Sequence, residues 1–174
     1  FSPGRPELSA TEIVNKVGMP RSTVYRLLAA LVEARLLERS SQSGNYMVAP
    51  ALYVLGSTYL HTTDLLKASR PVMEILNEIT KEAVSVSVFD SGNVIITMRE
   101  EAKYQFRYSH HIGTVIPAYT SAIGKAFLSE LSEQELDRLF PEEKLRPVTA
   151  KTNVSKKQLK LELQQVRKSG VAFD

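Results

Sequence analysis

The stretch that most constrains this chain runs from Leu8 to Leu37 and is typical of two short helices joined by a tight turn. Ser9 lies three residues before Glu12, a spacing at which each side chain satisfies a free backbone N–H at a helix start. Gly18 predicts the end of this helix. Pro20 can open the next helix, because the N–H that proline lacks is unsatisfied there anyway. The pattern predicts a helix-turn-helix.

The second helix of this stretch combines an apolar face with a polar one. Four apolar residues recur at i, i+3, i+4 and i+7, which predicts a stripe facing a core. They are Val24, Leu27, Leu28 and Leu31. The opposite face begins with basic and hydroxyl side chains, which can reach phosphates and base edges in the major groove. The predicted DNA-binding residues are Arg21, Ser22, Thr23, Tyr25 and Arg26. An ordinary helical hairpin with a solvated polar face is the alternative.

Residues 36–48 are typical of a β-hairpin, because two short apolar runs enclose the turn-forming sequence SSQSGN. A hairpin directly behind a helix-turn-helix is a wing. Arg39 stands at its base, where it can lie along phosphate or the minor groove, and we include it among the predicted DNA-binding residues. The alternative is a hairpin that only covers the helix core.

Two helices are expected next. Pro50 opens a short apolar helix over residues 51–60, which is too short to be stable alone. It is expected to pack against a partner copy or the wing and to link two domains. A longer helix follows over 64–82, with Pro71 inside it. From residue 83 the apolar residues alternate, which predicts a β-hairpin that turns at 90–93.

The remainder of the sequence predicts a strand at 104–108, a loop at 110–117 and three helices. The helices are expected at 119–129, capped by Thr120 or Ser121, at 132–140, with Ser132 and Glu135 in capping-box spacing, and at 155–169, ended by Gly170. A strand-like run begins at 171–174. Strands and helices without regular βαβ alternation predict an α+β domain.

Composition excludes several classes of protein. The 174 residues are 43% hydrophobic and 24% charged, as in a globular protein, and no apolar run approaches a membrane span. The absence of Cys excludes disulfides and thiolate catalysis and is compatible with the cytoplasm, where we expect the protein. A net charge of +3 permits nucleic acid as a partner. The turn-rich start and the interrupted run at the end lead us to expect a fragment.

Four stretches resemble parts of a known family. LSATEIVNKVGMPRSTVYRLLAALVEARLLER with GNYMVAPALYVLG resembles the winged helix-turn-helix of the isocitrate lyase regulator (IclR) family of bacterial transcription factors. IGTVIPAYTSAIGKAFLSEL is similar to that family's effector-domain signature, and QVRKSGVAFD to the helix and strand that follow. The resemblance implies that the family's first DNA-binding helix and the last part of its effector domain are missing from this chain.

The resemblance also implies a domain order. A winged helix-turn-helix would occupy 1–49, a linker helix 50–62, and a GAF-like effector domain with an antiparallel sheet 63–174. Together these make an α+β protein that binds a double-stranded DNA operator, forms a homodimer or tetramer, and responds to a small-molecule effector. The effector is expected to be a small organic acid or an aromatic molecule, and repression is favoured over activation. Neither a cofactor nor a membrane is expected.

The effector site is expected where an aromatic strand meets a helix start, since a helix N-terminus beside an aromatic wall suits a small anionic or aromatic molecule. Its predicted residues are Phe106, Tyr108, Ala122, Ile123 and Gly124. The family usually has a small residue where Ile123 stands, so this side chain would narrow the pocket. The alternative is that the aromatic residues are simply core.

Ser109, His110 and His111 invite another interpretation, an enzyme or a metal-dependent sensor that uses this loop. Adjacent histidines at a strand end point to opposite faces, which argues against one metal bound by both. Lys125 after Gly124 is not part of a phosphate-binding loop, because the glycine and hydroxyl residues of that motif are absent. We therefore predict a transcription regulator and neither catalysis nor a metal site.

Overall fold

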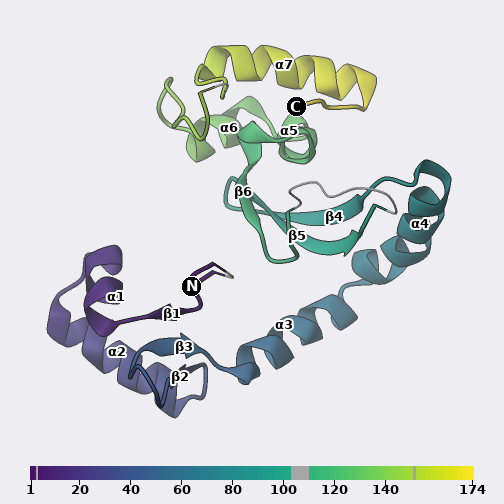
Figure 1. The fold of residues 1–174 in the computed structure, drawn as a ribbon. Helices are drawn as coiled ribbons and strands as arrows, with labels where there is room; N and C mark the ends of the chain where they lie inside the picture. Colours follow the sequence, from purple (N-terminus) through teal and green to yellow (C-terminus); the bar gives the residue numbers. More distant parts are fainter. Residues whose placement is uncertain (3, 103–109, 151) are drawn as a thin grey trace. The chain divides into compact units, whose positions relative to one another are not determined.

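The computed structural model describes residues 1–2, 4–102, 110–150 and 152–174. The chain divides into two compact units, Phe1–Asp64 and Leu65–Asp174, whose elements are drawn in Figure 1. Within the described ranges, no helix combines the length and the apolar character needed to cross a membrane.

The first unit contains the predicted pair of helices, α1 (Ala10–Val17) and α2 (Arg21–Glu33). The capping box is confirmed, since Ser9 Oγ accepts the Glu12 N–H at 3.3 Å and the Glu12 carboxylate accepts the Ser9 N–H at 2.8 Å. Gly18 ends α1 at a φ of 69°, in the left-handed region that glycine adopts without strain. Two local signals in the sequence therefore determine where α1 starts and stops.

The apolar stripe of α2 is only half buried. Val24 and Leu28 are each 3% exposed and form a core with Leu37 and Tyr46 from the wing. Leu27 and Leu31 are 46% and 37% exposed, so the prediction that all four stripe residues face a core is wrong for these two. The physical reason is that α1 and the wing hairpin, which pack on α2, cover only one edge of the stripe.

The residue before α2 also differs from expectation. Pro20 has a φ of −52° and a ψ of 135°, which is not helical, and the helix starts one residue later at Arg21. Pro20 therefore precedes the helix instead of opening it. Its carbonyl still accepts the Val24 N–H at 3.1 Å, which closes the first helical turn.

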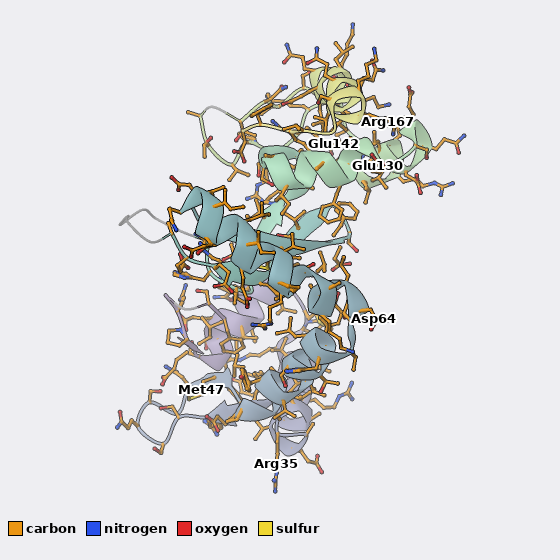
Figure 2. All side chains as sticks on the ribbon, turned by 90° about the vertical axis from the view of Figure 1, so that its right-hand side faces the viewer. Arg35, Met47, Asp64, Glu130, Glu142 and Arg167 are labelled. Atoms are coloured by element: carbon orange, nitrogen blue, oxygen red, sulfur yellow. The ribbon has the colours of Figure 1, made fainter. Side chains whose placement is uncertain are left out.

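The predicted wing is confirmed as an antiparallel hairpin of β2 (Leu37–Arg39) and β3 (Tyr46–Val48). A strand that the sequence analysis missed, β1 (Glu7–Leu8), pairs with the other edge of β3. The sheet order is therefore β1-β3-β2, with Met47 on its middle strand (Figure 2). Two residues are too few to carry an alternating pattern, which is why β1 was not predicted.

Helix α3 (Pro50–Thr62) begins at Pro50 as predicted. Among the described residues, most of its apolar side chains are exposed. The exposed ones are Leu52, Tyr53, Val54, Leu55 and Tyr59.

The second unit contains a helix and a three-stranded antiparallel sheet of order β4-β5-β6. Helix α4 (Asp64–Thr80) includes Pro71, and the predicted hairpin is confirmed as β4 (Val84–Asp90) and β5 (Asn93–Glu100). Strand β6 (Val115–Pro117) pairs with the start of β5, so the prediction of a loop over all of 110–117 is wrong. The predicted strand at 104–108 lies outside the described residues.

One helix packs directly on strands β4 and β5, and two further helices share a core with it. A 3₁₀ turn, η1 (Ala118–Thr120), precedes α5 (Ala122–Ser129), so the helix expected from residue 119 starts three residues later, with Ser121 as its N-cap. Next come α6 (Glu133–Leu139) and α7 (Lys156–Ser169), with the expected capping box and the terminal Gly170. Figure 1 shows α7 lying across α5 and α6. The buried core residues here are Val94, Ala118, Leu128, Leu136, Leu145, Leu159 and Leu163.

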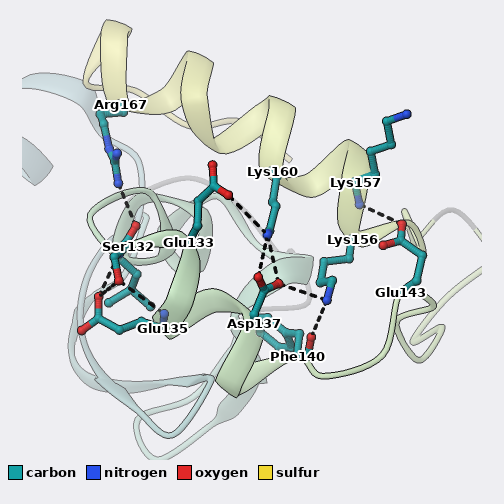
Figure 3. Close-up of polar contacts among 11 residues, drawn as sticks. Ser132, Glu133, Glu135, Asp137, Phe140, Glu143, Lys156, Lys157, Lys160 and Arg167 are labelled. Carbon is teal, nitrogen blue, oxygen red and sulfur yellow. Dashed lines mark hydrogen bonds and ion pairs between the residues drawn. The ribbon is translucent and has the colours of Figure 1, made fainter.

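Polar contacts join α6 and α7 around this core (Figure 3). Lys160 Nζ and Lys156 Nζ each lie about 3 Å from the Asp137 carboxylate. The hydrogen bond from Lys160 is the largest cause that lowers the pKa of Asp137, and the same bond raises the pKa of Lys160. Both groups therefore stay charged at neutral pH.

Candidate nucleic-acid and effector sites

The outward face of α2 carries the predicted DNA-binding side chains. Arg21, Ser22 and Arg26 are exposed, Tyr25 is exposed and Thr23 is half-buried. Arg21 Nη2 donates to the Tyr25 hydroxyl at 3.4 Å, and its guanidinium carbon lies 5.6 Å from the centroid of the Tyr25 ring. The hydrogen bond to Tyr25 raises the pKa of Arg21, a side chain that is charged at any physiological pH.

The wing places Arg39 at the end of β2, one residue before the turn. Arg39 Nε donates to the Gly44 carbonyl at 3.2 Å, and its guanidinium lies 5.5 Å from the centroid of the buried Tyr46 ring. The charged group is thereby held over the hairpin while it stays exposed. An arginine fixed in this way presents its remaining donors to an anion without first losing rotamer entropy.

A cavity of about 430 Å³ lies beside the start of α5 in the second unit. Tyr119, Ser121 and Lys125 line it from the α5 side, and His110 and Asp174 lie at its wall. The predicted residues 122–124 lie on the same helix start, but it is their neighbours Ser121 and Lys125 that face the cavity.

The N–H of Ala122, the first residue of α5, donates to the Asp174 carboxylate at 2.8 Å. Lys125 Nζ forms an ion pair with Glu162 of α7 at 2.6 Å and donates to the Phe173 carbonyl at 3.1 Å. These bonds hold the segment after Gly170 against α5. The expectation of a strand at 171–174 is therefore wrong: the described segment is irregular and is bound by side chains instead of by a sheet edge.

Ile123 and Gly124 serve the packing of α5. Ile123 is half-buried and packs against the core of this unit. A Cβ at Gly124 would lie 2.1 Å from the Ala118 carbonyl oxygen, so only glycine permits the close approach of η1 and α5. Phe106 and Tyr108, the predicted aromatic wall, lie outside the described residues.

The structure adds Lys125 and Asp174 to the candidate effector site, and sequence reasoning did not select either one. No local signal could have found Asp174, because it meets Ala122 across 52 residues of sequence. Lys125 had a weak signal, as a basic residue one position after a glycine at a helix start.

The alternative site at 109–111 is only partly described. Ser109 lies outside the described residues, and His110 and His111 are exposed. Within the described ranges, no group of three or more His, Cys, Asp or Glu side chains is arranged to hold a metal ion.

A helix-turn-helix with a wing, followed by an antiparallel α+β unit, defines the class of winged helix-turn-helix proteins with a second domain. The chain belongs to the IclR family of bacterial transcriptional regulators. The IclR helix-turn-helix domain model matches residues 1–41, and the model of the bacterial transcriptional regulator IclR C-terminal domain matches residues 57–174. The resemblance and the fold class predicted from the sequence are confirmed, and the family consists of regulators, not enzymes.

Comparisons with individual proteins agree. The transcriptional repressor IclR of Escherichia coli (strain K12) is 31% identical over 169 residues, which are 96% of this chain and 62% of the repressor. The chain thus spans less than two thirds of this relative. The crystal structure of an IclR-type regulator from Silicibacter sp. TM1040 matches with a TM-score of 0.86 at 24% identity, over 99% of this chain and 68% of that one.

A third comparison includes a ligand. An IclR homologue from Microbacterium hydrocarbonoxydans, whose structure is a complex with 4-hydroxybenzoate, matches with a TM-score of 0.72 at 20% identity. The match covers 98% of this chain and 70% of that one. At this identity the likeness establishes a shared fold.

Proposed function

We propose that this protein is a DNA-binding transcription regulator whose winged helix-turn-helix reads a double-stranded operator. The observation that carries the proposal is the outward face of α2, where Arg21, Ser22 and Arg26 are exposed next to a wing that carries Arg39. Arginines on such a helix reach guanine edges or phosphates. Repression is the favoured outcome, because the relative from Escherichia coli is named a repressor. The cytoplasm, where such an operator is found, is the proposed location.

The test compares Arg26→Ala with the unmodified protein on two DNAs: a duplex that the protein itself selects from a random pool, and an unselected random duplex. If Arg26 reads a base, binding to the selected duplex weakens by about 1–3 kcal/mol while random binding changes little. If it contacts only phosphate, both weaken and the salt slope falls by about one. Arg138→Ala, which removes an exposed arginine from α6, is the charge control. Unchanged binding of Arg26→Ala to both duplexes contradicts the proposal.

We further propose that a small organic acid or aromatic effector binds at the start of α5, at a site that includes Phe106, Tyr108, Ala122, Ile123 and Gly124. Support comes from the Asp174 carboxylate, which accepts the Ala122 N–H as a ligand carboxylate would, beside a cavity of about 430 Å³. Binding would bias the arrangement of the DNA-binding units, with a coupling of about 1–3 kcal/mol.

Ala122→Pro tests this site sharply. Proline is tolerated as the first residue of a helix, and Ser121 before it is already extended, so the substitution removes the N–H donor and leaves α5 intact. Ala122→Gly keeps the N–H and is the matched control. We expect 4-hydroxybenzoate, but not phenol, to bind the glycine variant and the unmodified protein, and the proline variant to lose binding in calorimetry. Equal binding to all three proteins places the ligand elsewhere, and binding to none of them rules out this class of effector.

We propose in addition that the protein self-associates through α3, which would link a DNA-binding domain at 1–49 to an effector domain at 63–174. The exposed apolar side chains of α3, Leu55 at 59% among them, support a dimer or tetramer. Leu55→Glu is expected to shift the sedimentation of the protein toward the monomer. Leu161→Glu on α7, where the leucine is 54% exposed, is the matched control and is expected to leave the assembly intact. An unmodified protein that sediments as a monomer at micromolar concentration contradicts the proposal.

A further inference from the structure

The wing tip, residues 40–45, is held almost entirely by polar bonds. The Ser40 N–H donates to the Asn45 carbonyl at 2.8 Å, and the Gly44 N–H donates to the Ser40 carbonyl at 2.9 Å. Ser43 Oγ accepts the Asn45 N–H at 3.2 Å. The tip contains no apolar side chain. Its conformation therefore depends on these bonds and on hydrogen bonds between its side chains and residues outside the tip.

One outside contact comes from Glu7 on β1. Ser43 Oγ donates to Glu7 Oε2 at 2.6 Å, and Asn45 Nδ2 lies 3.5 Å from the same oxygen. Glu7 is itself fixed, because it pairs with Met47 of β3 in the sheet. A carboxylate 36 residues away in sequence from Ser43 thus joins the first strand to the wing tip. A hydrogen bond to a charged acceptor is stronger than one between neutral groups.

Electrostatic attraction to DNA does not explain why the Glu7 carboxylate lies beside the wing tip. A negative charge beside a surface that binds DNA opposes the phosphates, and removing it should tighten binding. Glu38 makes the comparison clear. It pairs with Met47 from the opposite side of β3, so Glu7 and Glu38 share one face of the three-stranded sheet. Among the described residues, only Glu7 of the two is hydrogen-bonded to the tip.

We propose that Glu7 is a positioning residue for DNA binding: its carboxylate orders the wing tip through Ser43 and Asn45 and so holds the wing, with Arg39, in the conformation that meets the duplex. Arg39 secures the same tip from the other side through the Gly44 carbonyl. This inference rests on the proposed DNA-binding function. Glu7 contacts no phosphate or base in this mechanism and acts through the residues it holds.

The experiment compares four variants with the unmodified protein on a duplex selected by that protein: Glu7→Ala, Glu7→Gln, Ser43→Ala and Glu38→Ala. We expect Glu7→Ala and Ser43→Ala to bind about three- to tenfold more weakly, the range expected for the loss of one hydrogen bond of ordinary net strength at an exposed position. Glu7→Gln retains an oxygen that accepts the Ser43 hydroxyl and is expected to bind at least as well as the unmodified protein. Glu38→Ala removes only a like charge and is expected to bind equally or more tightly.

Two further readouts separate positioning from simple loss of stability. Hydrogen exchange of the Gly44 and Asn45 amides should accelerate in Glu7→Ala and stay slow in Glu7→Gln, with the thermal midpoint of the protein unchanged. The salt slope of Glu7→Ala should fall by about one if Arg39 loses its phosphate contact. The inference is overturned if Glu7→Ala binds as tightly as Glu38→Ala, or if Glu7→Gln weakens binding as much as Glu7→Ala. Failure of the unmodified protein to prefer its selected duplex would instead overturn the proposed function.

Discussion

Helices α7 and α4 have apolar residues at similar spacings, but α7 buries these side chains and α4 leaves most of them exposed. On α7, Leu159 and Leu163 are each 3% exposed and belong to the core of the second unit. On α4, Ile75 and Ile79 are 59% and 72% exposed, although they stand at the same spacing of four residues. An apolar helical stripe therefore predicts that a face will be covered, but the stripe itself does not say by what.

The difference lies in what each helix meets. Helix α7 packs on α5 and is tied to α6 by the ion pairs of Lys160 and Lys156 with Asp137. Helix α4 buries Leu66 and Met73, at 1% and 2% exposure, and leaves its other apolar side chains outside. The same contrast separates α5, which is closely packed, from α3, which is exposed along its length. Four predictions test it.

The largest effect is expected from Leu163→Ala on α7. Removing a buried leucine side chain leaves a cavity and should lower the free energy of unfolding by about 2–5 kcal/mol. Ile79→Ala on α4 is the matched control and should stay within about 0.5 kcal/mol. Urea denaturation at low protein concentration measures both. If Ile79→Ala lowers the free energy of unfolding as much as Leu163→Ala does, another surface covers α4 in solution. The two helices would then not differ in burial.

Two helical glycines provide the next test. At Gly124 an added Cβ meets the Ala118 backbone, so Gly124→Ala should lower the free energy of unfolding by about 1–3 kcal/mol. At Gly56, inside α3, an added Cβ meets nothing within 4 Å. Gly56→Ala should therefore raise helix stability by about 0.5–1 kcal/mol, because alanine loses less backbone entropy. Opposite shifts in the thermal midpoint are expected, and shifts of the same sign would contradict this account of close packing at α5.

Ile123→Ala is expected to have an intermediate effect. The side chain is half-buried against the core, so its truncation should lower the free energy of unfolding by about 1–2 kcal/mol, less than at a fully buried position. Operator binding without ligand should remain. If the variant keeps its stability and changes its response to 4-hydroxybenzoate, Ile123 belongs to the effector cavity and not to the core. Denaturation and DNA titration of this one variant distinguish the two roles.

Acid should produce the smallest effect, through the two capping boxes. Hydrogen bonds from Ser9 lower the pKa of Glu12, and those from Ser132 lower the pKa of Glu135. Since each folded pKa lies below its unfolded value, the stabilisation is complete above about pH 4.3 and is lost as the pH falls through the folded values. The double variant Glu12→Gln and Glu135→Gln should show a shallower fall of the thermal midpoint below that pH. An unchanged acid profile would mean that packing alone holds these helix starts.

Local signals were sufficient for much of the fold. The two capping boxes, the glycines that end α1 and α7, and both β-hairpins were all predicted from the sequence. Each of these features depends on residues within a few positions of one another, so the chain carries the information locally. The outward arginines of α2 belong to the same group, because the helix period alone places Arg26 on the face opposite Leu28.

Long-range contacts decided the rest, and no local pattern could reveal them. Strand β6 exists because Val115–Pro117 returns to the edge of β5, and the irregular segment at the end is held because Asp174 reaches Ala122. Whether Leu27 is buried depends on which elements pack on α2, and whether Glu7 orders the wing depends on β1 pairing with β3. The sequence by itself determined which segments form helices and hairpins and fixed the capped ends of α1, α6 and α7, because caps and periodicity act over one or two turns. Only the tertiary structure decided which faces are covered and which polar groups meet, because burial and pairing require segments that lie tens of residues apart.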